Sequence, residues 1–355
     1  MLYAFIIGKN KSLSKEELSC YFEKEGVAWK IMDEGNEFLI IESEKIEPSI
    51  VKDLGGTIKI GKVMSIEHIE FDGSFGVSVY GGSFSLKKET GMMIKKKMKA
   101  LGIKTKFFQT RQTALTAVEV LKKNLIGREI LVLKGASTLY AITESVYDPF
   151  EYKRLDMDRP KQRGMYSISI RLSKILINLA KLKKGQTMLD PFCGYGTILQ
   201  AGMLSGLNVY GTDNDDDCIR SSEENIQWLK EKYGVKGGHA LRKVDVKDID
   251  REFEHEKFDA VISEAYLGPP LRKSVRDMEA GQIIADLSGF YDRALNKLSH
   301  VLRKGGRIVI VLPLIVTKRS KFKVTVQPKG LKFVKSIEDV SPKHITGRDI
   351  YIFEK

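Results

Sequence analysis

The stretch Asp190-Pro191-Phe192-Cys193-Gly194-Tyr195-Gly196-Thr197 places an acid, two glycines and a hydroxyl within a short span. An apolar run precedes it and a helix-forming run follows it. A strand that ends in an acid and turns through glycines into a helix brings bare backbone next to a ligand, because glycine has no Cβ. This pattern predicts a ligand-binding turn whose residues are Asp190, Phe192, Gly194, Gly196 and Thr197.

Two further acids follow short apolar segments at spacings typical of neighbouring parallel strands. Asp213 lies 17 residues after Gly196, at the end of Val209-Tyr210-Gly211-Thr212-Asp213. This distance suits a carboxylate that accepts hydrogen bonds from the ribose hydroxyls of a nucleoside-like cofactor. Asp245 ends the next predicted strand and is placed to receive an adenine amino group. The third glycine of the dinucleotide fingerprint is replaced by Leu199, so the turn is not expected to hold a pyrophosphate.

These three strand-end acids around one glycine turn resemble the class I S-adenosylmethionine-dependent methyltransferases, in which Asp-Pro-Phe-x-Gly-x-Gly-Thr is the first cofactor motif. The resemblance implies a doubly wound, Rossmann-like α/β domain that binds S-adenosylmethionine. It implies cofactor contacts from the five residues of the turn and from Asp213 and Asp245. A nucleotide-binding dehydrogenase and a purely structural turn remain the alternatives.

The predicted fourth strand, Phe258 to Ser263, should lead into the catalytic loop. Methyltransferases of exocyclic amines usually have Asp/Asn-Pro-Pro-Tyr/Phe there, whereas this chain has Glu264-Ala265-Tyr266-Leu267-Gly268-Pro269-Pro270. Three interpretations stay open. Glu264 holds the amine while Tyr266 stacks on the flipped base, or the target atom differs from a guanine amine, or the site is degenerate and the protein only binds RNA. Phosphate contacts and a solvated loop explain the basic residues Arg272, Lys273 and Arg276 equally well.

Composition narrows the function classes. The 355 residues carry a net charge of +13, and 71–148 holds 13 Lys/Arg against 6 Asp/Glu, whereas 1–70 holds 9 against 13. A basic middle segment is typical of a polyanion-binding surface, and a solvated lysine-rich face explains it equally well. Three unclustered cysteines and five dispersed histidines predict a cytoplasmic protein with neither a disulfide framework nor a metal site. No apolar run is long enough to span a membrane.

The organisation along the chain predicts three domains and a linker. Residues 1–70 have a βαββαβ pattern typical of a ferredoxin-like module, 149–163 read as a linker, and 164–355 as the methyltransferase domain, which begins with an amphipathic helix over 165–180. The start of the chain, with Phe5-Ile6-Ile7-Gly8-Lys9-Asn10, Leu13-Ser14 and Glu17-Leu18, resembles the N-terminal module of THUMP-containing RNA-modifying enzymes. The basic segment 71–148 resembles the THUMP domain of the same enzymes. That resemblance implies RNA binding, and we expect the contacts to come from Lys95, Lys96, Lys99, Lys104, Lys106 and Arg111.

Taken together, the chain is similar to the THUMP-domain tRNA guanine-N2 methyltransferases of archaea and eukaryotes. This resemblance implies methyl transfer from S-adenosylmethionine to the exocyclic N2 amine of a guanosine in tRNA, with Glu264 and Tyr266 as the catalytic residues. We expect a monomer, and the need for a small activator subunit is left open. The alternatives are an amino-methylase acting on rRNA or DNA, and a silent RNA-binding protein that keeps the methyltransferase fold.

Overall fold

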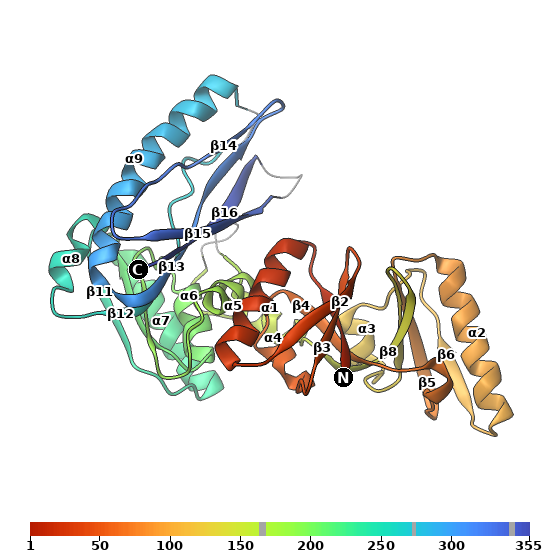
Figure 1. The fold of residues 1–355 in the computed structure, drawn as a ribbon. Helices are drawn as coiled ribbons and strands as arrows, with labels where there is room; N and C mark the ends of the chain where they lie inside the picture. Colours follow the sequence, from red (N-terminus) through yellow and green to blue (C-terminus); the bar gives the residue numbers. More distant parts are fainter. Residues whose placement is uncertain (163–167, 272–274, 341–344) are drawn as a thin grey trace. The chain divides into compact units, whose positions relative to one another are not determined.

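The computed structural model describes residues 1–162, 168–271, 275–340 and 345–355. The chain divides into two compact units, Met1–Arg154 and Leu155–Lys355. Each unit is built on an eight-stranded sheet of its own (Figure 1). No helix in the described ranges combines the length and the apolar character that crossing a membrane requires.

The first unit contains one mixed sheet in the order β2-β3-β1-β4-β8-β7-β5-β6. Its strands are β1 (Leu2–Ile7), β2 (Trp29–Glu34), β3 (Phe38–Ser43), β4 (Thr57–Val63), β5 (Gly73–Tyr80), β6 (Thr105–Phe108), β7 (Glu129–Lys134) and β8 (Thr138–Val146). Its helices are α1 (Lys11–Glu25), η1 (Pro48–Lys52), η2 (Ile66–His68), α2 (Phe84–Ala100), α3 (Ala117–Lys122) and α4 (Pro149–Met157), the last of which runs into the second unit.

Four antiparallel strands from residues 1–70 form one end of this sheet, and strand β4 joins them to β8. The second helix of the βαββαβ pattern expected over residues 1–70 is the short 3-10 helix η1. The segment 149–163 was expected to be a linker, yet its first part forms α4, which starts at Pro149. Proline is tolerated in the first turn of a helix because the amide it lacks has no partner there.

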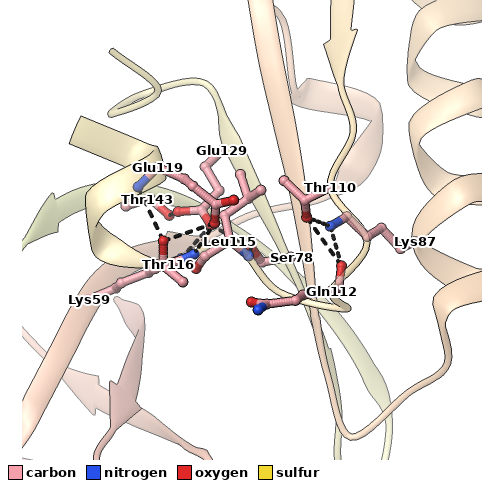
Figure 2. Close-up of polar contacts among 10 residues, drawn as sticks. All are labelled: Lys59, Ser78, Lys87, Thr110, Gln112, Leu115, Thr116, Glu119, Glu129 and Thr143. Carbon is pink, nitrogen blue, oxygen red and sulfur yellow. Dashed lines mark hydrogen bonds and ion pairs between the residues drawn. The ribbon is translucent and has the colours of Figure 1, made fainter. Parts of the chain in front are cut away.

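A buried polar cluster lies across the central strands of this sheet, from β4 to β5 (Figure 2). Glu129 of β7 is fully buried, and its Oε1 accepts hydrogen bonds of 2.5 Å from both Lys59 Nζ of β4 and Ser78 Oγ of β5. Thr143 Oγ1 donates to Glu129 Oε2 over 2.7 Å, and Lys59 also donates to the carbonyl of Leu115. A buried carboxylate is tolerated when it is paired and hydrogen-bonded in this way.

The second unit contains a sheet in the order β11-β10-β9-β12-β13-β16-β15, with β14 paired to β13. Its strands are β9 (Thr187–Asp190), β10 (Asn208–Asp213), β11 (His239–Lys243), β12 (Phe258–Glu264), β13 (Leu302–Val316), β14 (Lys321–Lys323), β15 (Lys332–Asp339) and β16 (Thr346–Glu354). Its helices are α5 (Ile170–Leu179), α6 (Thr197–Leu204), α7 (Asp216–Tyr233), η4 (Val246–Asp248), α8 (Ile249–Glu252) and α9 (Asp277–Val301).

The first five strands of this sheet run parallel, and β16 is antiparallel to both of its neighbours. Strands β12 and β13 are runs of buried apolar residues, as a sheet covered on both faces requires. The helix expected over 165–180 is α5, which begins at Ile170 after a Ser169 N-cap; residues 163–167 lie outside the described ranges. The predicted α/β, Rossmann-like architecture of this part is therefore confirmed.

Candidate active site

Four carboxylates lie at one edge of the second sheet. Asp190, Asp213 and Glu264 are the last residues of β9, β10 and β12, and Asp245 follows β11 as the N-cap of η4. Because these strands are parallel neighbours, their carboxyl ends meet at the same edge, where ligands bind in open α/β sheets. The structure therefore brings the predicted strand-end acids together.

The glycine turn is fastened to the end of β10 by Asp213. The backbone N–H of Gly194 donates to Asp213 Oδ2 over 3.0 Å, and the N–H of Asp215 donates to Oδ1 over 3.1 Å. Gly194 and Gly196 have φ angles of 50° and 79°, which other residues rarely adopt. A Cβ at Gly196 would also lie 2.3 Å from Ser222 Oγ on α7, so this glycine serves the packing of the turn as well as its conformation.

Asp190 lies beneath this turn and is only 1% exposed. Ser263 Oγ donates to Asp190 Oδ1 over 2.5 Å, and the N–H of Phe192 donates to the same oxygen over 3.2 Å. Burial, together with the nearby charges of Asp213 and Glu264, raises the pKa of Asp190 to about 7. Asp190 therefore lies buried below the turn and joins it to the end of β12 through Ser263.

Asp245 has a different environment, at the rim of the site. Its Oδ1 accepts from the N–H of Lys247 over 3.0 Å, and its Oδ2 lies 3.1 Å from Lys247 Nζ. The backbone hydrogen bond and the lysine lower the pKa of Asp245, so its carboxylate stays ionised. Asp213 and Asp245 are both half-buried.

Glu264 forms an ion pair that no local sequence pattern indicates. The Nε of Arg348 donates to Glu264 Oε1 over 2.6 Å, and the side chains of Arg348 and Glu264 are 31% and 11% exposed. Arg348 lies on β16 opposite Pro313 of β13, and β13 separates β16 from β12. The guanidinium therefore reaches across one strand to the carboxylate.

Tyr266 points to solvent, with 59% of its surface exposed. Its carbonyl oxygen accepts a hydrogen bond from the hydroxyl of Tyr291 on α9, which is fully buried and whose pKa is raised by burial. Ala265 is buried, and its N–H donates to the carbonyl of Val311 over 3.2 Å. The backbone of the loop is thus held at Ala265 and at the carbonyl of Tyr266, while the ring of Tyr266 is exposed. Arg276 is the N-cap of α9, and Arg272 and Lys273 lie outside the described residues.

The segment before α5 contributes Arg159, another residue that was not predicted. Its Nη1 donates to Thr197 Oγ1 at the start of α6, and the residue is 4% exposed. Asn225 of α7 fastens the same segment to the turn, since it accepts from Lys161 N and donates to the carbonyls of Lys161 and Tyr195. The Thr197 hydroxyl is therefore engaged by the protein itself.

Cys193 lies inside the turn with 6% exposure, and burial raises its pKa well above the usual value for a thiol. A buried thiol of this kind is a poor nucleophile. Within the ranges that the structure describes, no group of His, Cys, Asp and Glu side chains is arranged to hold a metal ion.

The predicted RNA-binding residues belong to the first unit. Lys95, Lys96 and Lys99 are exposed on α2, Lys104 and Lys106 are exposed at the edge strand β6 and just before it, and Arg111 is exposed in the following loop. Figure 1 shows α2 beside β5 and β6 at one end of the sheet. No salt bridge to a described acid neutralises any of these six side chains. Lys97 differs, because it donates to the carbonyls of Glu67 and Ile69.

Comparison with known proteins places this site in a family. The model of the RMKL-like methyltransferase domain matches residues 159–336. A tRNA (guanine(10)-N2)-dimethyltransferase of Methanothermobacter thermautotrophicus is 31% identical over 158 residues, which are 44% of this chain and 42% of that protein. The protein of the same name from Pyrococcus abyssi is 29% identical over 164 residues, which are 46% of this chain and 44% of that protein. The matched segments thus span less than half of both relatives.

Among solved structures, TrmN from Thermus thermophilus aligns over 100% of both chains with a TM-score of 0.57 and 15% sequence identity. A likeness at that identity shows the fold. The family model begins at Arg159, two residues before the contact of Lys161 with Asn225, and it includes the glycine turn, Asp213, Asp245 and Glu264. The chain belongs to the family of RMKL-like methyltransferase domains.

Proposed function

We propose that this protein transfers a methyl group from S-adenosylmethionine to the exocyclic N2 amine of a guanosine in tRNA. One observation supports this most strongly: an ionisable carboxylate, Glu264, ends β12 beside the strand β9 whose following turn is fastened to Asp213. An acceptor for an amine and a nucleoside-binding turn thus lie at adjacent strand ends.

The residues present fit S-adenosylmethionine. Asp213 is held by two backbone N–H groups and is half-buried, which leaves acceptor capacity on both oxygens for ribose hydroxyls. Asp245 is an ionised acceptor for the adenine amino group. Phe192 and Gly194 line the turn between these acids, whereas Asp190 and Thr197 support it from below through Ser263 and Arg159. When bound, this cofactor supplies an activated methyl group on a sulfonium.

Glu264 is the group best placed to hold the target amine. Its Oε1 is occupied by Arg348, so Oε2 is the oxygen that would accept a hydrogen bond from the amine and direct the nitrogen lone pair toward the methyl group. As the new bond to nitrogen forms, the amine must lose one proton, which Oε2 can take up and pass to water. Tyr266 would offer its exposed ring to the flipped base.

The first unit would hold the RNA. The strand order β2-β3-β1-β4, all antiparallel, supports a ferredoxin-like module over residues 1–70. The mixed part β8-β7-β5-β6 with α2 and α3 supports a THUMP domain over 71–148, and the un-neutralised lysines of α2 and β6 support RNA binding there. The two parts share one sheet, so they would act together. We propose that the protein works as a cytoplasmic monomer.

The relatives' names support tRNA as the substrate and indicate which nucleotide to examine first. Both archaeal relatives are named for methylation of guanine 10 of tRNA, so guanosine 10 is the first position to examine. An amino-methylase of rRNA or DNA is the alternative enzyme, and a silent RNA-binding protein is the alternative without catalysis.

Transfer of tritium from labelled S-adenosylmethionine to tRNA, rRNA and duplex DNA, offered separately to the full-length protein, tests the proposal. We expect label in tRNA alone. Label in rRNA or DNA would favour the other enzyme class, and label in none of them would favour the silent binder.

A further inference from the structure

The ion pair between Glu264 and Arg348 leaves one acceptor oxygen and several N–H donors of the two side chains available next to each other. Arg348 Nε is engaged by Glu264 Oε1. Among the described residues, neither Glu264 Oε2 nor the two terminal amino groups of Arg348 has a hydrogen-bond partner, and Arg348 remains 31% exposed. An acceptor therefore lies next to donors at the carboxyl end of β12.

The Watson–Crick edge of guanine carries the complementary pattern. It presents two neighbouring donors, the N2 amine and N1–H, followed by one acceptor, O6. The same edge of adenine differs at every position. Its amine is at C6, where guanine has O6, its N1 is an acceptor, and its C2 carries no polar group. A carboxylate that faces N1 of adenine would meet another acceptor, which is an unfavourable contact in a desolvated site.

We infer that Glu264 and Arg348 together read the target base, with Glu264 Oε2 facing N2–H and N1–H of guanine and a terminal amino group of Arg348 facing O6. This inference rests on the proposed function and extends it, because it makes Arg348 a specificity-determining residue. Flipped bases are commonly recognised by hydrogen bonds to this edge.

The fixed geometry of the pair supports the inference. Arg348 is held by the ladder between β16 and β13, and Glu264 by the ladder between β12 and β13, so both side chains start from rigid backbone. An arginine anchored through Nε keeps the rest of its planar fork pre-organised for a second acceptor. A lysine at this position would have to leave Glu264 to reach O6.

A tRNA with 2-aminopurine at the methylated position tests this assignment. This base keeps the 2-amino group but lacks O6 and N1–H. Single-turnover rates are measured for the guanosine and 2-aminopurine tRNAs with the wild type, Arg348→Met and Arg348→Lys. Arg303→Met is the matched control, because Arg303 forms an ion pair with Asp259 at the start of β12, at the other edge of the sheet.

We expect the wild type and Arg303→Met to prefer guanosine by about ten- to a hundredfold, as the loss of charge-assisted hydrogen bonds predicts. Arg348→Met should lose about tenfold or more of that preference. The preference of Arg348→Lys should lie between those of the wild type and Arg348→Met. Comparing this ratio between the wild type and each variant cancels any difference in amine reactivity between the two bases, because that difference enters every ratio equally. A wild-type enzyme that methylates both tRNAs equally would overturn the inference.

An unchanged ratio in Arg348→Met, with both rates reduced alike, would also overturn it, because Arg348 would then only position Glu264. No methylation of the guanosine tRNA by the wild type would instead contradict the proposed function itself. The two failures are therefore distinguishable.

Discussion

The hydroxyl of Ser263 donates a 2.5 Å hydrogen bond to Oδ1 of Asp190, and this bond joins the ends of β12 and β9 beneath the candidate site. Ser263 is fully buried, so solvent does not reach this contact between the two strand ends. The glycine turn stands above Asp190 and Glu264 follows directly after Ser263. This contact fixes the glycine turn relative to Glu264, the two groups to which the proposed function assigns the cofactor and the target amine.

The raised pKa of Asp190 predicts how stability depends on pH. The unfolded chain releases this proton near pH 4, whereas the folded protein keeps it up to about pH 7. The folded state therefore binds more protons in this window, and the free energy of unfolding contributed by Asp190 falls as pH rises from about 4 to 7. Asp190→Asn should flatten that fall.

Urea unfolding of the second unit at several pH values tests this, with Trp228 as the fluorescent probe in a Trp29→Phe background. Asp286→Asn, an exposed position on α9, is the control and should keep the wild-type slope. Identical slopes for Asp190→Asn and wild type would refute the assignment of this proton to Asp190.

Asp213 should contribute to cofactor affinity in two ways. Asp213→Ala removes the proposed acceptor for ribose hydroxyls and also releases the N–H of Gly194, which loosens the turn. We expect a loss of about 1.5–3 kcal/mol in the binding of S-adenosylhomocysteine, the product form of the cofactor. Isothermal titration calorimetry measures it. Unchanged affinity would contradict both contributions and remove Asp213 from the proposed cofactor site.

Charge reversal of Lys95, Lys96 and Lys99 should weaken tRNA binding and reduce its salt dependence by about one log–log unit for each phosphate that is no longer neutralised. Cofactor affinity should not change. The control is Lys30→Glu, because Lys30 is exposed on β2, the opposite edge strand of the same sheet. Filter binding across a range of salt concentrations gives the slopes. Equal slopes for the triple variant and Lys30→Glu would mean that α2 is only a solvated face.

Removal of one partner of the buried Lys59–Glu129 pair should strongly destabilise the first unit. Lys59→Met leaves the fully buried Glu129 carboxylate without its cation, which typically costs about 3–5 kcal/mol. The double variant Lys59→Met/Glu129→Leu should recover much of the loss, because no buried charge remains. Urea unfolding followed through Trp29 in a Trp228→Phe background isolates this unit. A cost below about 1 kcal/mol for Lys59→Met would contradict the expectation.

The spacing of apolar runs and terminal acids predicts the parallel part of the second sheet and its strand-end carboxylates, because both are local features of sequence. Arg348 cannot be found in this way. It meets Glu264 only through the register of β16 against β13, and 84 positions separate the two residues in the chain. Arg159 lies in the predicted linker, and its local sequence does not indicate a role in the site. Its contact with Thr197 also depends on tertiary packing.

The first unit shows the same limit. Lys104, Lys106 and the two phenylalanines between Lys106 and Gln109 have the pattern of a basic stretch, yet residues 105–108 form the edge strand β6. Four residues are too few for an alternation to stand out. The pairing of β4 with β8, which unites residues 1–70 and 71–148 in one sheet, is equally invisible to local pattern.

Nucleoside mass mapping of tRNA methylated in vitro by the wild type and by Glu264→Ala and Glu264→Gln tests the central claim most directly. We predict that the wild type forms N2-methylated guanosine at one tRNA position, that Glu264→Gln retains part of the activity through its amide oxygen, and that Glu264→Ala loses most of it. Calorimetry should show that all three bind S-adenosylhomocysteine alike. Methylation of a different atom, or equal rates for Glu264→Ala and wild type, would contradict the claim that Glu264 holds a guanine amine.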